Sequence, residues 1–179
     1  MVHVFIAKPD IVAVKGEWVT LPQKREELFE ILSKYPNGYI VTDYAGDAIY
    51  FKDFIQEIMN LATFNEGLCI LEENGLALCD GIFAAAAAFD GTDFSDFVFK
   101  IVEDRIKVLD MNDTKGWQMG KEEAAGRLLW QEGFLTTVDL TGVNDNIAQW
   151  IDWEDVFENE LDWSMVSINQ TPYLVNTNF

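Results

Sequence analysis

The segment Asp152-Trp-Glu-Asp-Val-Phe-Glu-Asn-Glu-Leu-Asp162, with the residues that follow it, decides the fold class of this chain. Asp152 is a typical helix-capping residue, and the apolar side chains after it recur at helical spacing, so we expect a helix over residues 153–162. Residues 165–168 and 173–175 are expected to be strands of a hairpin joined by Asn169-Gln-Thr-Pro172. A helix followed directly by a hairpin predicts a mixed α+β unit.

The residues just upstream continue this mixed pattern. Strands are expected at residues 107–111 and 134–140. A helix is expected between them, at residues 120–132, with four side chains on its buried face: Ala124, Ala125, Leu128 and Leu129. Residues 107–179 are therefore expected to form one acidic α+β unit at the C-terminal end of the chain.

The first third of the chain predicts a second α+β unit, at residues 1–64. Strands are expected at residues 2–7, 17–21 and 39–42, with a turn at 43–47. A helix is expected over residues 22–35, with Thr20 as its cap and Gln23 in the capping-box position. Another helix is expected over residues 53–64, and its inward side chains would be Phe54, Ile58, Leu61 and Ala62.

The middle of the chain, residues 65–106, is expected to be helical throughout. Helices are expected at residues 66–73, 76–89 and 93–105, and the second contains five consecutive alanines, the residue with the highest helix propensity. The whole chain is thus expected to be α+β, with three small units in an elongated arrangement. Mixed units at the two ends would flank a helical middle unit.

Composition excludes several classes of protein. The chain has 179 residues, 49% apolar and 13% aromatic, which is too apolar for a disordered acidic tail. Its 31 acidic and 12 basic residues exclude a basic surface that binds nucleic acid directly. The most apolar window, residues 75–89, is shorter than the roughly 20 residues of a membrane span. No signal peptide is apparent, so we expect a soluble, cytoplasmic protein without membrane partners.

The acidic residues are concentrated toward the C-terminus. The net charge is −3 over residues 1–60, −7 over 61–120 and −9 over 121–179, which together make −19. After Arg127 the chain contains nine acidic residues and no Lys or Arg. This gradient favours a surface that is negative for a functional reason, although solubility or adaptation to high salt would produce an acidic composition too.

The helix expected over residues 153–162 separates charge from core. Trp153, Val156, Phe157 and Leu161 fall on one side, and Glu154, Asp155, Glu158 and Asp162 fall on the other. Like charges four residues apart destabilise an isolated helix, so this arrangement needs an explanation. Four residues rise about 6 Å, a spacing at which carboxylates can stand in for successive phosphates of a nucleic acid. An ordinary solvated helix face is the alternative.

No catalytic or metal-binding motif is recognisable. His3 is the only histidine, which leaves no plausible catalytic triad, and two cysteines with one histidine match no zinc motif. Asp110-x-Asn112-x-Thr114 begins like a calcium loop, but Gly and Glu are missing from the required later positions. We expect no enzyme activity, no cofactor and no metal. A carboxylate pair in a tryptophan-lined cleft remains an alternative.

Several short segments carry a family resemblance. They are Val4-Phe-Ile-Ala7, Gly16-Glu-Trp-Val-Thr-Leu-Pro22, Glu26-Glu-Leu28, Tyr39-Ile-Val-Thr-Asp-Tyr44, Asn60-Leu61, Gly116, Glu122-Glu-Ala-Ala125, Glu132-Gly-Phe134, Ile151-Asp-Trp-Glu154, Glu160-Leu161 and Tyr173-Leu-Val175. In this order they resemble the ArdA antirestriction proteins, over residues 1–64 and about 110–179.

The resemblance implies a specific function. ArdA proteins are elongated, dimeric DNA mimics that inhibit type I restriction–modification enzymes, are carried on mobile genetic elements and need no cofactor. It implies a homodimer here, with the methyltransferase core as partner and no direct contact with nucleic acid. An acidic module that binds another basic protein is the alternative. The expected partner-binding acids are Asp110, Asp113, Glu122, Glu123, Glu132, Asp139, Asp145, Asp152, Glu154, Asp155, Glu158, Glu160 and Asp162.

Overall fold

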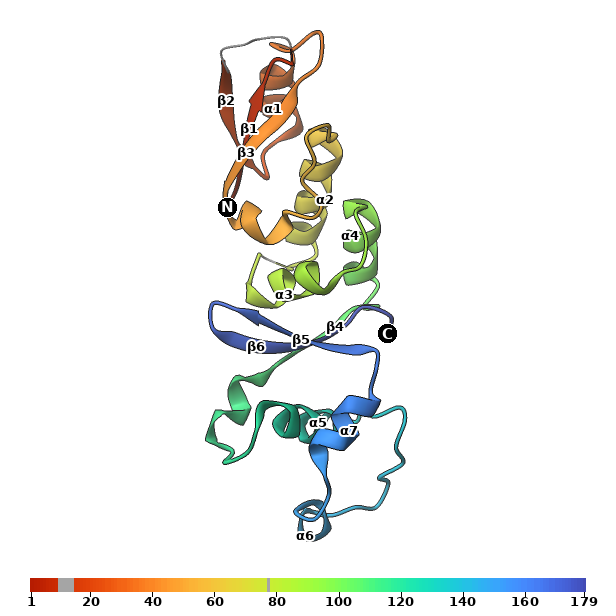
Figure 1. Ribbon diagram of the computed structural model, residues 1–179. Helices are drawn as coiled ribbons and strands as arrows, with labels where there is room; N and C mark the ends of the chain where they lie inside the picture. The colour runs from red at the N-terminus through yellow and green to blue at the C-terminus, as the bar shows by residue number, and fades with distance from the viewer. Residues whose placement is uncertain (10–14, 77) are drawn as a thin grey trace.

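The described part of the chain has an α+β fold. The computed structural model describes residues 1–9, 15–76 and 78–179, apart from the side chain of Asp113. Helices and two three-stranded antiparallel sheets make up this part, so the predicted fold class is confirmed. In Figure 1 the elements are stacked along one axis, with the first sheet at the top, β4, β5 and β6 in the middle and α6 at the bottom. The expected division at residues 64 and 106 stays a prediction.

The first sheet has the strand order β2-β1-β3. β1 (Val2–Ala7) lies between β2 (Gly16–Leu21) and β3 (Ile40–Gly46) and is antiparallel to both. All three strands were expected, but β3 runs on to Gly46, so the turn predicted at 43–47 is wrong. Pairing with β1 explains the difference, because Val2 to Phe5 lie opposite residues 43–46.

The first helix, α1 (Arg25–Leu32), is shorter than expected. Thr20 does not cap it, because Thr20 lies in β2 opposite His3, and Lys24 stands at the cap position without a side-chain hydrogen bond. The backbone of Gln23 is already engaged elsewhere. Its N–H donates to Asn65 Oδ1 at 2.9 Å, and its carbonyl accepts from Asn65 Nδ2 at 3.0 Å. The helix therefore begins at Arg25, beyond the residue that makes these contacts.

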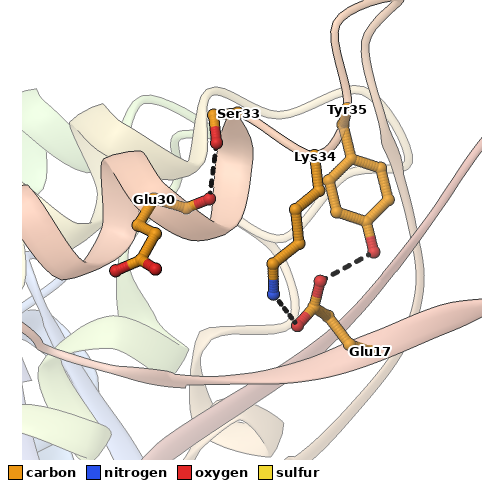
Figure 2. A network of polar contacts seen from close by, with 5 residues as sticks. All are labelled: Glu17, Glu30, Ser33, Lys34 and Tyr35. Atoms are coloured by element: carbon orange, nitrogen blue, oxygen red, sulfur yellow. Dashed lines mark hydrogen bonds and ion pairs between the residues drawn. The ribbon is translucent and has the colours of Figure 1, made fainter.

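Polar contacts tie the segment after α1 to β2, as Figure 2 shows. The carboxylate of Glu17 accepts hydrogen bonds from Lys34 Nζ at 2.9 Å and from the hydroxyl of Tyr35 at 3.3 Å. Burial raises the pKa of Tyr35, and the negative charge of Glu17 raises it further. Ser33 Oγ donates to the carbonyl of Glu30 at 2.7 Å, which satisfies an acceptor at the end of the helix.

The prediction of a helix over residues 53–64 is wrong. A 3-10 helix, η1 (Asp47–Phe51), is followed by irregular chain, and α2 begins only at residue 61 (Leu61–Glu73). Asn60 sets this start, because its side chain accepts hydrogen bonds from the N–H groups of Ala62 and Thr63. Phe54 and Leu61 are buried as expected, whereas Ala62 is exposed and Ile58 is 83% exposed.

The middle of the chain is helical, as expected, although with different boundaries. α3 (Asp80–Ala88) is shorter than the helix predicted over residues 76–89, of which residue 77 lies outside the described residues. α4 (Phe94–Val102) is capped by Asp93, whose Oδ1 accepts from Ser95 N at 2.8 Å. Phe94 of α4 packs edge-on against Phe51 of η1 and Phe54, tilted against Phe64 of α2, and stacked against Phe97.

The second sheet has the order β4-β6-β5, with β4 (Lys107–Asp110), β5 (Trp163–Ile168) and β6 (Thr171–Asn176). β5 and β6 form the expected hairpin. Its loop is only Asn169 and Gln170, both at positive φ, because the pairing already begins at Ile168 and Thr171. Asn169 also joins the hairpin to earlier elements: it accepts from the Tyr50 hydroxyl at 3.0 Å and donates to Asp80 Oδ1 at 3.1 Å.

Both faces of this sheet are covered. Tyr173 and Val175 belong to the main cluster of buried side chains, which extends from Val2 through the helices. Leu174 belongs to a second cluster, with Leu129 of the helix α5 (Lys121–Glu132). Figure 1 shows α3 on one side of the sheet and α5 on the other. The sheet thus connects the C-terminal acidic helices to the rest of the core.

A candidate acidic interaction surface

Helix α7 (Trp153–Asn159) is positioned by a close crossing with α5. A Cβ atom at Gly126 of α5 would collide with the carbonyl oxygen of Trp153, so the two backbones meet where only glycine fits. The Trp153 ring packs 5.2 Å from the ring of Trp130. Its indole N–H donates to the carbonyl of Ala148, in the short helix α6 (Asp145–Ala148), at 2.9 Å. α7 is therefore positioned by its packing against α5 and by its hydrogen bond to α6.

The exposed side of α7 carries three carboxylates, Glu154, Asp155 and Glu158, which we call the α7 acids. Trp153 and Val156 are buried, and Phe157 is half-buried, so the predicted separation of charge from core is confirmed for these residues. Asp152 caps the helix as predicted, accepting from Asp155 N at 3.2 Å. Acidic residues in a first turn are favoured by the helix dipole, which offsets part of their mutual repulsion.

The predicted end of this helix, at residue 162, is wrong. α7 stops at Asn159, so Asp162 lies beyond it and forms no helical pair with Glu158. Leu161, expected in the core, is 89% exposed. The chain turns at Glu160, which takes the inward position instead. Asp162 is still exposed, but on the turn that leads into β5.

Glu160 is not available to a partner, contrary to the prediction. It is only 2% exposed, and its carboxylate accepts hydrogen bonds from the backbone N–H and the hydroxyl of both Thr136 and Thr137, at 2.7 to 2.8 Å. Burial disfavours the charged form, but these hydrogen bonds outweigh burial and hold the pKa of Glu160 below its usual range. Residues 134–140, which include both threonines, are irregular, so the strand predicted there is wrong.

Most of the other predicted acids are exposed. Glu123 is half-buried and accepts a hydrogen bond from Gly120 N at 3.3 Å. Asp139 accepts from Thr141 N at 2.9 Å, and hydrogen bonding from Thr141 lowers its pKa. The side chain of Asp113 lies outside the described residues. The exposed acids outside α7 are Asp110, Glu122, Glu132, Asp139, Asp145, Asp152 and Asp162.

The structure brings only some of these acids into one packed unit. The α7 acids and Glu122, Glu123 and Glu132 lie on two helices in direct contact. Asp110 lies apart, at the end of β4, where it caps the 3-10 helix η2 (Met111–Gly116) by accepting from Asn112 N at 2.8 Å. The candidate surface is therefore centred on α5 and α7.

Within the described residues, no Lys or Arg side chain forms an ion pair with the acids of this surface. In the described part of the chain, the ion pairs join Met1 to Asp47, Lys34 to Glu17, Lys100 to Asp96 and Lys107 to Asp104, and none includes a predicted partner-binding acid. Arg127, the last base of the chain, lies over the ring of Trp117 at 5.2 Å. Uncompensated carboxylates create a negative potential that attracts cationic partners and is screened by salt.

Sequence reasoning missed three residues on which this surface depends. Gly126 allows α5 and α7 to approach, and Thr136 and Thr137 hold Glu160. The two threonines are β-branched, which is why they were assigned to a strand. A glycine inside an otherwise helical pattern is the one local signal of a close approach.

Comparisons with known proteins do not assign a family to this chain. Neither a scan of protein-family models nor a search of curated proteins finds a match to this chain. The described residues contain no group of three or more His, Cys, Asp or Glu side chains placed to hold a metal ion. Over the same residues, no helix is both long and apolar enough for a membrane span. The ArdA resemblance therefore rests on the segments quoted above.

Proposed function

We propose that this protein is an antirestriction DNA mimic of the ArdA type. Its acidic surface would occupy the DNA-binding groove of a type I restriction–modification enzyme, at the methyltransferase core. The protein would act as a cytoplasmic homodimer encoded by a mobile element, without catalysis, cofactor or direct contact with nucleic acid. The observation that carries the proposal is the set of exposed α7 acids, which stand on a rigidly packed helix and take part in no described ion pair.

Electrostatics explains how such a surface would compete with DNA. A protein that binds DNA gains affinity by placing Lys and Arg against phosphates. Carboxylates on a fixed scaffold present a similar field to the same cations, and the field also accelerates the encounter. The chain needs no reactive group for this, because occupation of the groove is sufficient to block DNA.

Displacement of DNA from a purified type I methyltransferase tests the proposal. We expect the protein to release labelled DNA at low salt. A variant with Glu154, Asp155 and Glu158 all changed to Lys should lose this ability. The control variant changes three exposed acids of the N-terminal unit, Glu27, Glu30 and Glu57, to Lys, so that the net charge changes equally.

Two outcomes would contradict the proposal. One is a failure of the unaltered protein to displace DNA at low salt. The other is an equal loss in the test and control variants, which would mean that only net charge matters. Binding to a basic protein of another kind, with no effect on the methyltransferase, would favour the alternative of a general acidic interaction module.

A further inference from the structure

A groove of about 720 Å³ lies between α1 and α2, far along the chain from the acidic C-terminal helices. Leu28, Phe29 and Leu32 line it from α1, and Ala62 and Cys69 line it from α2. Leu28 and Phe29 lie four and three residues before Leu32, and Ala62 lies seven residues before Cys69, so each helix contributes one face. Charged residues at the start of α1, namely Lys24, Arg25 and Glu26, also line the groove, so it combines apolar side chains of two helices with charged ones.

Phe29 is the most conspicuous side chain of this groove. It is 73% exposed, although its neighbour Leu28 is buried in the core. The ring therefore contributes little to folding and leaves a large apolar surface in water. Exposed aromatic side chains beside a cavity are typical of sites that bind other proteins.

The α2 side of the groove is negative. Glu66, Glu72 and Glu73 line it, and none of the three forms an ion pair within the described residues. Glu72 and Glu73 lie in the last turn of α2, which contains no basic residue, so both oppose the helix dipole. Their placement costs helix stability, which is understandable if they serve binding.

The same carboxylates act on the thiol of Cys69, which also lines the groove. Burial raises the pKa of Cys69, and the negative charges of Glu72, Glu73 and Glu66 raise it further. The shift agrees with the geometry, because each carboxylate lies three or four residues from Cys69 along α2 and thus on the same helix face. A cation placed there would be stabilised by the same field.

The walls are held at a fixed separation. Asn65 of α2 is buried and makes paired hydrogen bonds with the backbone of Gln23, just before α1. The groove is thus formed before any partner arrives, which reduces the entropy cost of binding.

We propose that this groove binds a cationic amphipathic helix of a partner protein. From Ala62 to Glu73 the wall rises about 16 Å, the length of three helical turns. Apolar side chains of the partner would face Phe29, Leu28 and Leu32, and its Lys or Arg side chains would face the α2 carboxylates. A second copy of this chain offers few cations for this groove, because it has 12 basic residues against 31 acidic ones. The proposal is independent of the antirestriction function.

A designed peptide of about 14 residues tests the proposal. It consists of leucine and lysine, with leucines at the i, i+3, i+4 and i+7 positions of a helix-in-groove ligand. Binding is measured by fluorescence anisotropy. We expect Phe29→Ala to weaken binding about tenfold, as for an aromatic hot spot. Phe99→Ala, which removes a ring 51% exposed on α4, should leave binding unchanged.

A second pair of variants tests whether the carboxylates of α2 contribute to peptide binding. The double variant Glu72→Gln with Glu73→Gln should weaken binding and flatten its salt dependence. The matched double variant Glu27→Gln with Glu30→Gln changes exposed acids of α1 that do not line the groove, and it should bind normally.

The two cysteines locate the bound peptide. Cys69 lines the groove, whereas the exposed Cys79 lies outside it. Bound peptide should slow alkylation of Cys69 and leave alkylation of Cys79 unchanged, as read by mass spectrometry. Equal protection of both thiols would overturn the proposal. So would equal affinity for a peptide of the same composition in scrambled order, or unchanged affinity in Phe29→Ala.

Discussion

The carboxylate of Glu160 accepts two hydrogen bonds from Thr137, one from the backbone N–H at 2.8 Å and one from the hydroxyl at 2.7 Å. Thr136 makes the equivalent pair, so four donors hold one buried charge. The two threonines precede Glu160 by 24 and 23 positions in the chain. This contact closes the loop after α5 onto the end of α7. It also removes one acid from the surface.

Replacement of Glu160 should lower stability in a pH-dependent way. The pKa of Glu160 is lowered in the folded state, so its stabilising contribution is complete above the ordinary glutamate pKa and is lost as the pH falls through the lowered pKa. Glu160→Gln should therefore reduce the free energy of unfolding at neutral pH by about 1–3 kcal/mol. The difference from the unaltered protein should shrink in acid. Urea unfolding at several pH values measures it.

The exposed neighbour Glu158 supplies the control for this experiment. Glu158→Gln removes a carboxylate from the same helix without a buried hydrogen bond, so its effect on stability should be within about 0.5 kcal/mol at every pH. Similar pH profiles for the two variants would show that the Glu160 contacts do not stabilise the fold.

Gly126→Ala should destabilise the C-terminal unit. The added methyl group would meet the carbonyl of Trp153, and α5 and α7 would have to separate. We expect a loss of about 1–3 kcal/mol, measured by thermal or urea unfolding. Gly116→Ala is the control, because its Cβ would meet no atom within 4 Å. Equal stability of the two variants would show that the helices tolerate a wider separation.

Variants of Asn169 separate backbone conformation from side-chain contacts. Asn169→Gly keeps the positive φ but loses the hydrogen bonds with Tyr50 and Asp80, which should cost about 1 kcal/mol. Asn169→Ala loses the contacts and is also strained at positive φ, so it should cost about 1 kcal/mol more. Urea unfolding distinguishes them. An equally stable Ala variant would mean that the hairpin relaxes to another turn.

Single acids of the surface should matter little for displacement of DNA. Glu158→Ala leaves Glu154 and Asp155 in place, so we expect a change in affinity of less than about threefold, as for one exposed charge. Loss of all three α7 acids should reduce this affinity by much more than the three single losses added together. Abolition of binding by Glu158→Ala alone would contradict a distributed surface.

Local patterns were most informative where the spacing of apolar residues matches the burial of an element. β1, α5 and the β5–β6 hairpin lie at the predicted places, because alternation or helical spacing of apolar residues coincides with burial there. The charge gradient is likewise a property of composition alone. The exposure of the α7 acids followed from helical geometry once Asp152 had marked the start.

Boundaries and buried polar contacts required the tertiary structure. Gln23 pairs with Asn65, 42 residues away, and this contact delays the start of α1. Glu160 accepts a hydrogen bond from Thr137, 23 residues away, where the chain turns after α7. Leu161, the next residue, is left exposed to water. The groove between α1 and α2 also depends on elements distant in sequence.

The amino-acid sequence by itself thus determined the α+β class, the main strands and helices, and the negative C-terminal region. The tertiary structure decided which acids are free, where helices end and what lines the groove. The physical reason is that periodicity and capping act within a few residues, whereas a buried polar group takes whichever distant partner the fold brings within hydrogen-bonding distance.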